Sequence, residues 1–216
     1  MKQHTSVKKL VLLAMLAAMA YVIVSFIRIP VILFLKYEPK DVIITIGGFL
    51  LGPMASFITS LVVSFLEMVT VSETGPIGCL MNLISTCAFS CTAALIYKRK
   101  HTLKGAVVGL TAGWFFMVIA MLLWNWLITP LYMGVDRNTV ETMLVPVFLP
   151  FNLLKGGLNS AMILLLYKPL VTALRRTGLV EMHAAKSGST KHGIYLLALG
   201  LLATCVVLLL VLQGKI

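Results

Sequence analysis

Apolar residues fill most of this chain in long runs, and the polar positions between them divide it into segments of membrane-spanning length. A transmembrane helix needs about 20 mostly apolar residues. The runs predict helices over residues 10–27, 41–51, 54–69, 77–97, 104–128, 144–167 and 193–213. Gly52-Pro53 interrupts the second run, so we interpret it as two short helices. The pattern therefore predicts an all-α integral membrane protein with six helices up to Tyr167 and an additional C-terminal transmembrane helix.

These helices predict three parts of the chain: a six-helix membrane domain over residues 1–176, a polar linker over 177–192 and a C-terminal transmembrane segment over 193–216. The last segment carries no polar stripe, so we expect an anchor or a lipid-facing helix. The first run resembles a signal peptide that ends near Ala18-Met19-Ala20. It continues to Ile27, however, for roughly 18 residues, which is enough to span, and we interpret it as a retained first helix.

Composition supports the membrane assignment and gives an orientation. Apolar residues make up 60% of the 216 positions, and the formal net charge is +11. Such a charge would also suit nucleic acid, but the basic residues lie beside the spans on alternate loops. With the N-terminus inside, twelve of the 18 Lys and Arg residues fall on inner loops. By the positive-inside rule we expect a multi-pass cell-membrane protein with a cytoplasmic N-terminus and no nucleic-acid partner.

Lys155 is the most informative polar residue because it lies about 11 residues inside the apolar run 144–167. At ~1.5 Å per residue it is roughly 16 Å along the helix, near the middle of a bilayer. A charge at that depth costs at least ~2.5–3.5 kcal/mol and is a candidate functional residue. Asn152 and Asn159 lie three residues before it and four after it, on the same side of a helix. We expect this polar stripe to face a solute-binding interior.

Three carboxamides, Asn82, Asn125 and Asn152, fall in the outer halves of their predicted spans. Each can donate and accept a hydrogen bond, which suits a neutral, imide-like edge better than a bare anion. Aromatic residues that could stack on such a ligand are Trp124, Trp126, Tyr37 and Phe151. For any single Asn, an interhelical hydrogen bond remains the simpler alternative. Together with Lys155, they predict a ligand site.

The segment 30–40 is long enough to fold over the mouth of such a site. Within it, Glu38 is a candidate for contact with a ligand hydroxyl or with a basic partner. Asp41 is a second candidate, although it also stands where an N-cap would start the next helix. We expect Glu67 at the outer boundary of its helix, where it would not form a proton relay.

Catalytic motifs are missing from the sequence: there is no P-loop, no HExxH and no GxSxG. We therefore expect neither an enzyme nor a metal site, and no cofactor. The four cysteines follow no metal or disulfide pattern, so we interpret them as packing residues. Ala14 and Ala18 give the first helix a small-xxx-small face. This face would allow close packing within the chain or docking of a partner subunit.

Several stretches resemble a known family over about residues 8–176. They are Tyr37 to Val42, Gly52-Pro53, Gly75-Pro76 followed by Asn82, Asn125 ahead of Pro130-Leu131-Tyr132, and Pro150 to Gly156. These stretches resemble the substrate-binding S components of energy-coupling factor (ECF) vitamin transporters, and among them the riboflavin-specific members. The C-terminal span departs from that six-helix pattern.

The resemblance implies a six-helix S-component bundle with an outward-facing vitamin pocket and a gating first outer loop. It also implies a complex with one coupling membrane subunit and two cytoplasmic ATPases, which would supply the energy that this chain has no motif to supply. The residues implied to contact the isoalloxazine ring of riboflavin are Asn125, Asn152 and Lys155. Those implied to close over the site are Tyr37, Glu38 and Asp41, and those implied to face the coupling subunit are Ala14 and Ala18. The alternatives are an S component for another vitamin or FMN, and an autonomous small-solute carrier.

Overall fold

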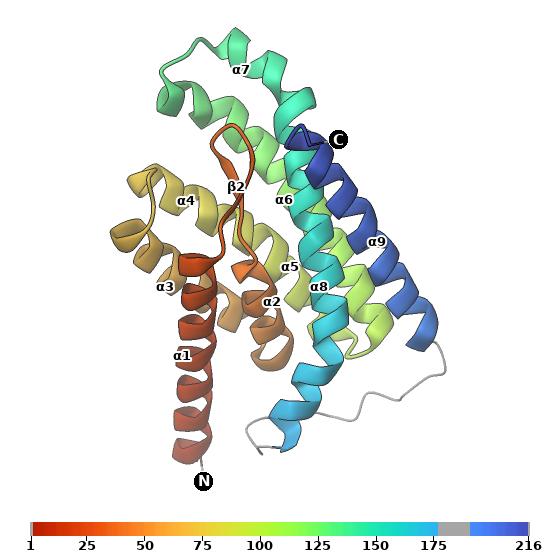
Figure 1. Ribbon diagram of the computed structural model, residues 1–216. Coiled ribbons are helices and arrows are strands. Elements are labelled where there is room, and N and C mark those ends of the chain that lie inside the picture. Colours follow the sequence, from red (N-terminus) through yellow and green to blue (C-terminus); the bar gives the residue numbers. More distant parts are fainter. Residues whose placement is uncertain (1, 177–190, 216) are drawn as a thin grey trace.

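The computed structural model describes residues 2–176 and 191–215, which form a bundle of helices with one small hairpin (Figure 1). The α-helices are α1 (Lys2–Phe26), α2 (Lys40–Leu51), α3 (Pro53–Thr70), α4 (Gly75–Thr86), α5 (Thr92–Arg99), α6 (Leu103–Met133), α7 (Arg137–Met143), α8 (Leu149–Arg176) and α9 (Lys191–Leu212). Two π-helical turns are η1 (Cys87–Cys91) and η2 (Leu144–Phe148), and the strands are β1 (Ile29–Ile32) and β2 (Leu35–Tyr37). Within the described ranges, six helices are long and apolar enough to cross a membrane.

The predicted break at Gly52-Pro53 is confirmed. Gly52 has φ 98°, a conformation that favours glycine, and Pro53 occupies the first position of α3, where its missing N–H is not needed. Helix α2 has 12 residues and is not among the six membrane-length helices. It packs against α1, α3 and α8 as an inner helix of the bundle.

Two of the membrane-length helices each contain a π-turn that joins two α-helical segments. Residues Gly75–Arg99 run through η1, and residues Arg137–Tyr167 run through η2. A π-turn inserts an extra residue and rotates the side chains that follow, and it is often found at functional sites. The turn η2 directly precedes the part of α8 that carries Asn152 and Lys155.

The segment expected as a loop over residues 30–40 contains an antiparallel hairpin. Ile29 pairs with Tyr37 and Pro30 with Lys36, and Leu33 at the tip has φ 51°. The ring of Phe34 lies 5.8 Å from that of Tyr132 and 6.3 Å from that of Phe148. The hairpin therefore lies against α6 and η2 at one end of the bundle, which we call the hairpin end.

Helix α9 packs along α8, on the side of the bundle opposite to α1 (Figure 1). It begins at Lys191 instead of at residue 193, so the last two positions of the predicted polar linker are helical. The rest of the predicted linker, 177–190, lies outside the described residues. Half of the α9 residues whose burial is described, 193–212, are exposed, as expected for a lipid-facing helix, but Ala198 and Cys205 are buried.

Helices α6 and α8 meet closely through Trp114. A Cβ atom added at Gly156 would lie only 2.0 Å from Trp114 Cδ1, and the bulky indole has little room to move. We expect Gly156→Ala to destabilise the fold by about 1–3 kcal/mol, the usual effect of overpacking. Gly200→Ala is the matched control, because no atom lies within 4 Å of its added Cβ. In detergent, Gly156→Ala should unfold at a lower temperature than the wild type, and Gly200→Ala at the same temperature or a higher one. A Gly156→Ala variant that unfolds at or above the wild-type temperature would contradict this packing.

Candidate ligand-binding hollow

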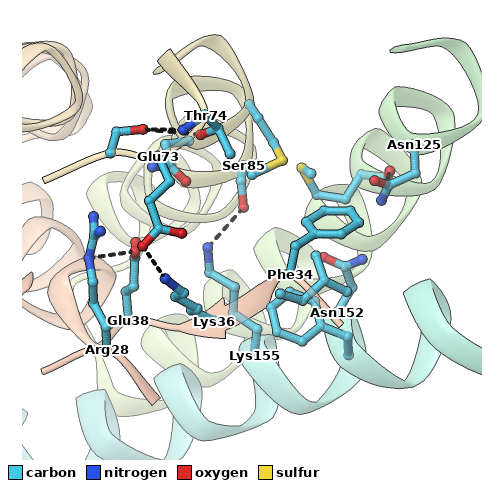
Figure 2. Close-up of a pocket in the computed structure, with 16 residues that line it drawn as sticks. Arg28, Phe34, Lys36, Glu38, Glu73, Thr74, Ser85, Asn125, Asn152 and Lys155 are labelled. Carbon is cyan, nitrogen blue, oxygen red and sulfur yellow. Dashed lines mark hydrogen bonds and ion pairs between the residues drawn. The ribbon is translucent and has the colours of Figure 1, made fainter. Parts of the chain in front are cut away.

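A hollow opens at the hairpin end of the bundle, between the hairpin, the α3–α4 loop, α4, α6 and α8 (Figure 2). Its empty space, including the open mouth, is about 760 Å³. The polar groups that line its interior are Asn82, Ser85, Asn125, Asn152 and Lys155. Phe34 and Phe151 add aromatic surface. Of these two, only Phe151 was expected from the sequence; Phe34 was missed because its role depends on the hairpin.

The three predicted carboxamides line this hollow together, although they come from three different helices. Asn125 donates to Met121 O and accepts from Thr129 Oγ1, both on its own helix. Asn152 donates to Phe148 O, also on its own helix. The simpler alternative of an interhelical bond therefore does not describe these two residues.

One polar atom of Asn152 has no hydrogen-bond partner among the described residues. Its Oδ1 is buried and accepts no hydrogen bond from any residue in the described part of the chain. A buried oxygen without a donor costs free energy, and such an atom calls for an explanation. Because Asn152 lines the hollow, its Oδ1 is a candidate acceptor for a ligand N–H or O–H.

Lys155 projects into the hollow from α8, and its amine forms an ion pair on its inner side. Its Nζ lies 3.3 Å from Asp41 Oδ2. The same atom lies 3.4 Å from Ser85 Oγ, as Figure 2 shows. Only 6% of the residue is exposed. The ion pair fixes the amine at the wall of the hollow, where it can still donate to a bound molecule. The predicted buried cation is thus neither lipid-facing nor sealed away from the hollow.

Asp41 is fully buried beneath the hollow and does not line it. Its carboxylate accepts from Thr86 Oγ1 at 2.7 Å and from Asn159 Nδ2 at 3.4 Å. The alternative interpretation of Asp41 as an N-cap is wrong, because α2 begins at Lys40 and has no side-chain cap. The role that the geometry gives Asp41 is to orient Lys155.

Tyr37 and Trp124 also lie outside the lining of this hollow. The Tyr37 hydroxyl donates to Asn159 Oδ1 at 2.9 Å, and burial together with the nearby Asp41 charge raises the pKa of Tyr37. Trp124 lines a smaller neighbouring crevice, which shares Phe34 with the main hollow. Trp126 is tied to α7 instead, because its Nε1 donates to Glu141.

A buried ion cluster below the mouth was missed from the sequence. Lys40 Nζ lies 2.6 Å from Glu67 Oε1 and 2.8 Å from Glu38 Oε2, and both Lys40 and Glu67 are at most 1% exposed. Asn82 Nδ2 donates to Glu67 at 2.8 Å, so for this Asn the interhelical alternative holds. Glu67 lies near the end of α3 as expected, but it is inside the protein. The sequence signal was a single acidic residue within an otherwise apolar helix.

The mouth of the hollow carries further ion pairs. Arg28 Nε lies 3.3 Å from Glu38, and Lys36 Nζ lies 2.9 Å from Glu73. Burial alone would raise the pKa of Glu38, but the charges of Lys40, Lys155 and Arg28 outweigh it and hold that pKa below its usual value. The hydrogen bond from Lys36 likewise lowers the pKa of Glu73. Every cation that lines the hollow therefore has a carboxylate partner.

Among the described residues, no three His, Cys, Asp or Glu side chains are grouped to hold a metal ion. The arrangement offers amide, amine and aromatic groups, which bind and orient a molecule. A buried, amide-lined hollow within a bundle of membrane-length helices defines a membrane-embedded solute-binding protein.

Comparison with known proteins identifies the family. The chain belongs to the family described as ECF transporter, substrate-specific component, whose model matches residues 8–167. The chain is 31% identical to the riboflavin transporter RibU of Staphylococcus aureus (strain TCH60), over 78% of this chain and 93% of that protein. It is 29% identical to the riboflavin transporter FmnP of Bacillus subtilis (strain 168), over 69% of this chain and 85% of that protein.

A solved structure of the S component of a bacterial ECF transporter has the same fold. It matches with a TM-score of 0.67 and 32% identity, over 79% of this chain and 99% of that chain. The resemblance drawn from the sequence is therefore confirmed, as is the all-α S-component membrane fold with an extra C-terminal helix. The family is a transporter component and not an enzyme family. The family match ends at residue 167, and α9 lies beyond it.

Proposed function

We propose that this chain is a high-affinity riboflavin-binding membrane subunit of an ECF transporter. It imports riboflavin together with a coupling membrane subunit and two cytoplasmic ATPases. Two relatives that are about 30% identical carry the name riboflavin transporter, and the family is the substrate-specific component. Riboflavin is the transported ligand, and the proposal includes no cofactor.

The observation that carries this proposal is the meeting of Asn125, Asn152 and Lys155 at one hollow. The isoalloxazine ring has an imide edge with alternating acceptors and a donor. Asn152 Oδ1, which lacks a partner in the described chain, would accept from the ring N–H. Lys155 Nζ would donate to a ring carbonyl or to N5, and Phe34 and Phe151 would cover the apolar part of the ring.

The charge balance of the hollow favours a neutral ligand over FMN. A phosphate monoester binds best to cations that are free to form charge-assisted hydrogen bonds. Here Arg28, Lys36 and Lys155 each already pair with a carboxylate. Binding of FMN would therefore require a cation to leave its partner, whereas riboflavin requires no such exchange.

Quenching of flavin fluorescence on titration with the purified protein tests the proposal. We expect riboflavin to be quenched, and FMN to compete at least about tenfold more weakly, which corresponds to ~1.4 kcal/mol. Thiamine and folate should not compete. Equal binding of FMN would contradict the charge argument, and tight binding of thiamine or folate without riboflavin binding would contradict the proposed ligand.

The remaining predicted site residues have supporting roles in this proposal. Glu38 lines the mouth, where it contacts ligand hydroxyls or holds the hairpin through Arg28. Tyr37 and Asp41 act from beneath the hollow by positioning Asn159 and Lys155. Trp124 shapes the neighbouring crevice. Residues 1–176 form the binding domain, and 193–216 form a separate transmembrane segment.

Partner docking is proposed at α1. Ala14 and Ala18 are exposed, while Ala17 and Ala20 are buried against the bundle. An open face of small residues lets a second helix approach closely, so this face would receive the coupling subunit. The proposal places the N-terminus in the cytoplasm and lets the domain tilt in the membrane after binding. Uptake by proteoliposomes that contain this chain without any ATPase would instead favour an autonomous carrier.

A further inference from the structure

The C-terminal end of α9 reaches the hairpin that lies over the hollow. Gln213, directly after α9, donates from Nε2 to Pro30 O at 2.6 Å, and Pro30 belongs to β1. The two residues are 183 positions apart in sequence. The C-terminal end of α9 lies at the hairpin end of the bundle (Figure 1). A segment beyond the family match thus contacts the element that covers the binding site.

An apolar contact accompanies the hydrogen bond. Val31 and Leu35, one on each strand, are buried in a cluster with Phe148 and Leu154. Leu208, Leu209 and Leu212 of α9 pack against the same cluster. Helix α9 also contacts β1. The inner face of the hairpin therefore rests on α8 and α9 together.

The hairpin needs such support, because strands of four and three residues are marginally stable alone. Its other side is held at the mouth by Lys36 and Glu73, and the Glu73 side chain is 76% exposed. An exposed ion pair contributes only about 0–1 kcal/mol. The β2 side does not depend on this pair alone, because Leu35 is buried in the apolar cluster and the Tyr37 hydroxyl donates to Asn159 of α8 at 2.9 Å. In β1 the first two residues are exposed, so this strand depends most on its contact with α9.

We propose that the end of α9 is a clamp that fixes β1 and so holds the hairpin over the hollow, and that Gln213 is a positioning residue for this gate. Because access to the hollow passes the hairpin, the clamp sets how fast a ligand enters and leaves. The kinetic part rests on the proposed function, since it needs a ligand in this hollow. The anchoring part does not, and it can be measured without any ligand.

The test compares full-length Gln213→Ala, alone and combined with Leu212→Ala, with the wild type. Hydrogen exchange of the backbone amides in residues 29–37 is measured first, without flavin, and we expect faster exchange in the variants. Stopped-flow riboflavin quenching should then show association and dissociation rates that both rise about two- to tenfold, the range expected for one lost hydrogen bond. Because both rates rise, the Kd should change much less than either rate.

Leu199→Ala is the matched control, since Leu199 is an exposed leucine in the N-terminal half of α9, more than three turns from Gln213. It should leave both the hairpin exchange and the flavin rates at wild-type values. Unchanged hairpin exchange in the Gln213 variants would overturn the clamp. Faster exchange with unchanged flavin rates would overturn the gating role. A wild-type protein that binds no flavin would contradict the proposed function, while the exchange data would still decide the anchoring.

Discussion

Replacing Lys40 with methionine is expected to lower the free energy of unfolding by about 3–5 kcal/mol, because it leaves Glu67 buried without its cation and Glu38 with Arg28 alone. Lys40 Nζ contacts both carboxylates and is 0% exposed, so water cannot replace it. The change keeps the length of the side chain and removes its charge. Unfolding by heat or by denaturant, in detergent, measures the loss of free energy.

Lys36→Met is the matched control, because the same substitution there breaks only the exposed pair with Glu73. An exposed pair contributes about 0–1 kcal/mol, so this variant should unfold close to the wild type. Equal stability of the two variants would contradict the view that the Lys40 cluster is a buried ion pair that holds α2 against α3.

Lys155→Met is expected to weaken riboflavin binding by roughly tenfold to more than a hundredfold, the effect of losing a hydrogen bond of about 1.5–3 kcal/mol from a charged donor. The amine lies at the wall of the hollow and is oriented by Asp41 and Ser85. Loss of the charge also leaves Asp41 unpaired, so the stability of the variant must be measured beside its affinity. Fluorescence titration at a temperature where the variant is fully folded gives the Kd.

Asn152→Ala separates the two effects, because it leaves the pair between Lys155 and Asp41 in place. It should weaken binding by about 1–3 kcal/mol with little loss of stability. Lys98→Met, at an exposed position in the last turn of α5 and outside the lining of the hollow, should leave the Kd unchanged. Wild-type affinity in both Lys155→Met and Asn152→Ala would mean that the flavin site lies elsewhere.

The helices, and the polar residues of α8 that line the hollow, were predictable because a bilayer imposes strong constraints on a sequence. A span needs a long apolar run, so the runs located the helices, and Gly52-Pro53 located the break between α2 and α3. A charge inside such a run is costly, so the sequence indicated Lys155 and its neighbouring Asn residues as candidate site residues.

The hairpin and the ion cluster could not be predicted from the sequence, because both depend on contacts between distant segments. Lys40 stands at a helix start, beside residues that could all face water, and its pairing with Glu67 depends on how α2 folds back on α3. Tyr37 was expected to face the ligand, but the strand register turns it toward Asn159. Phe34 lines the hollow only because the chain reverses at Leu33. Such contacts follow from tertiary geometry, which no local pattern encodes.

The central claim is that the amide-lined hollow beside Lys155 holds a neutral flavin. Mass spectrometry of the small molecule that co-purifies with the wild-type protein tests it most directly, with the protein's absorption spectrum recorded on the same sample. We predict riboflavin, bound at close to one equivalent in the wild type and at a clearly lower level in the Lys155→Met variant. A different vitamin in the wild type, or riboflavin that remains fully bound in that variant, would contradict the account.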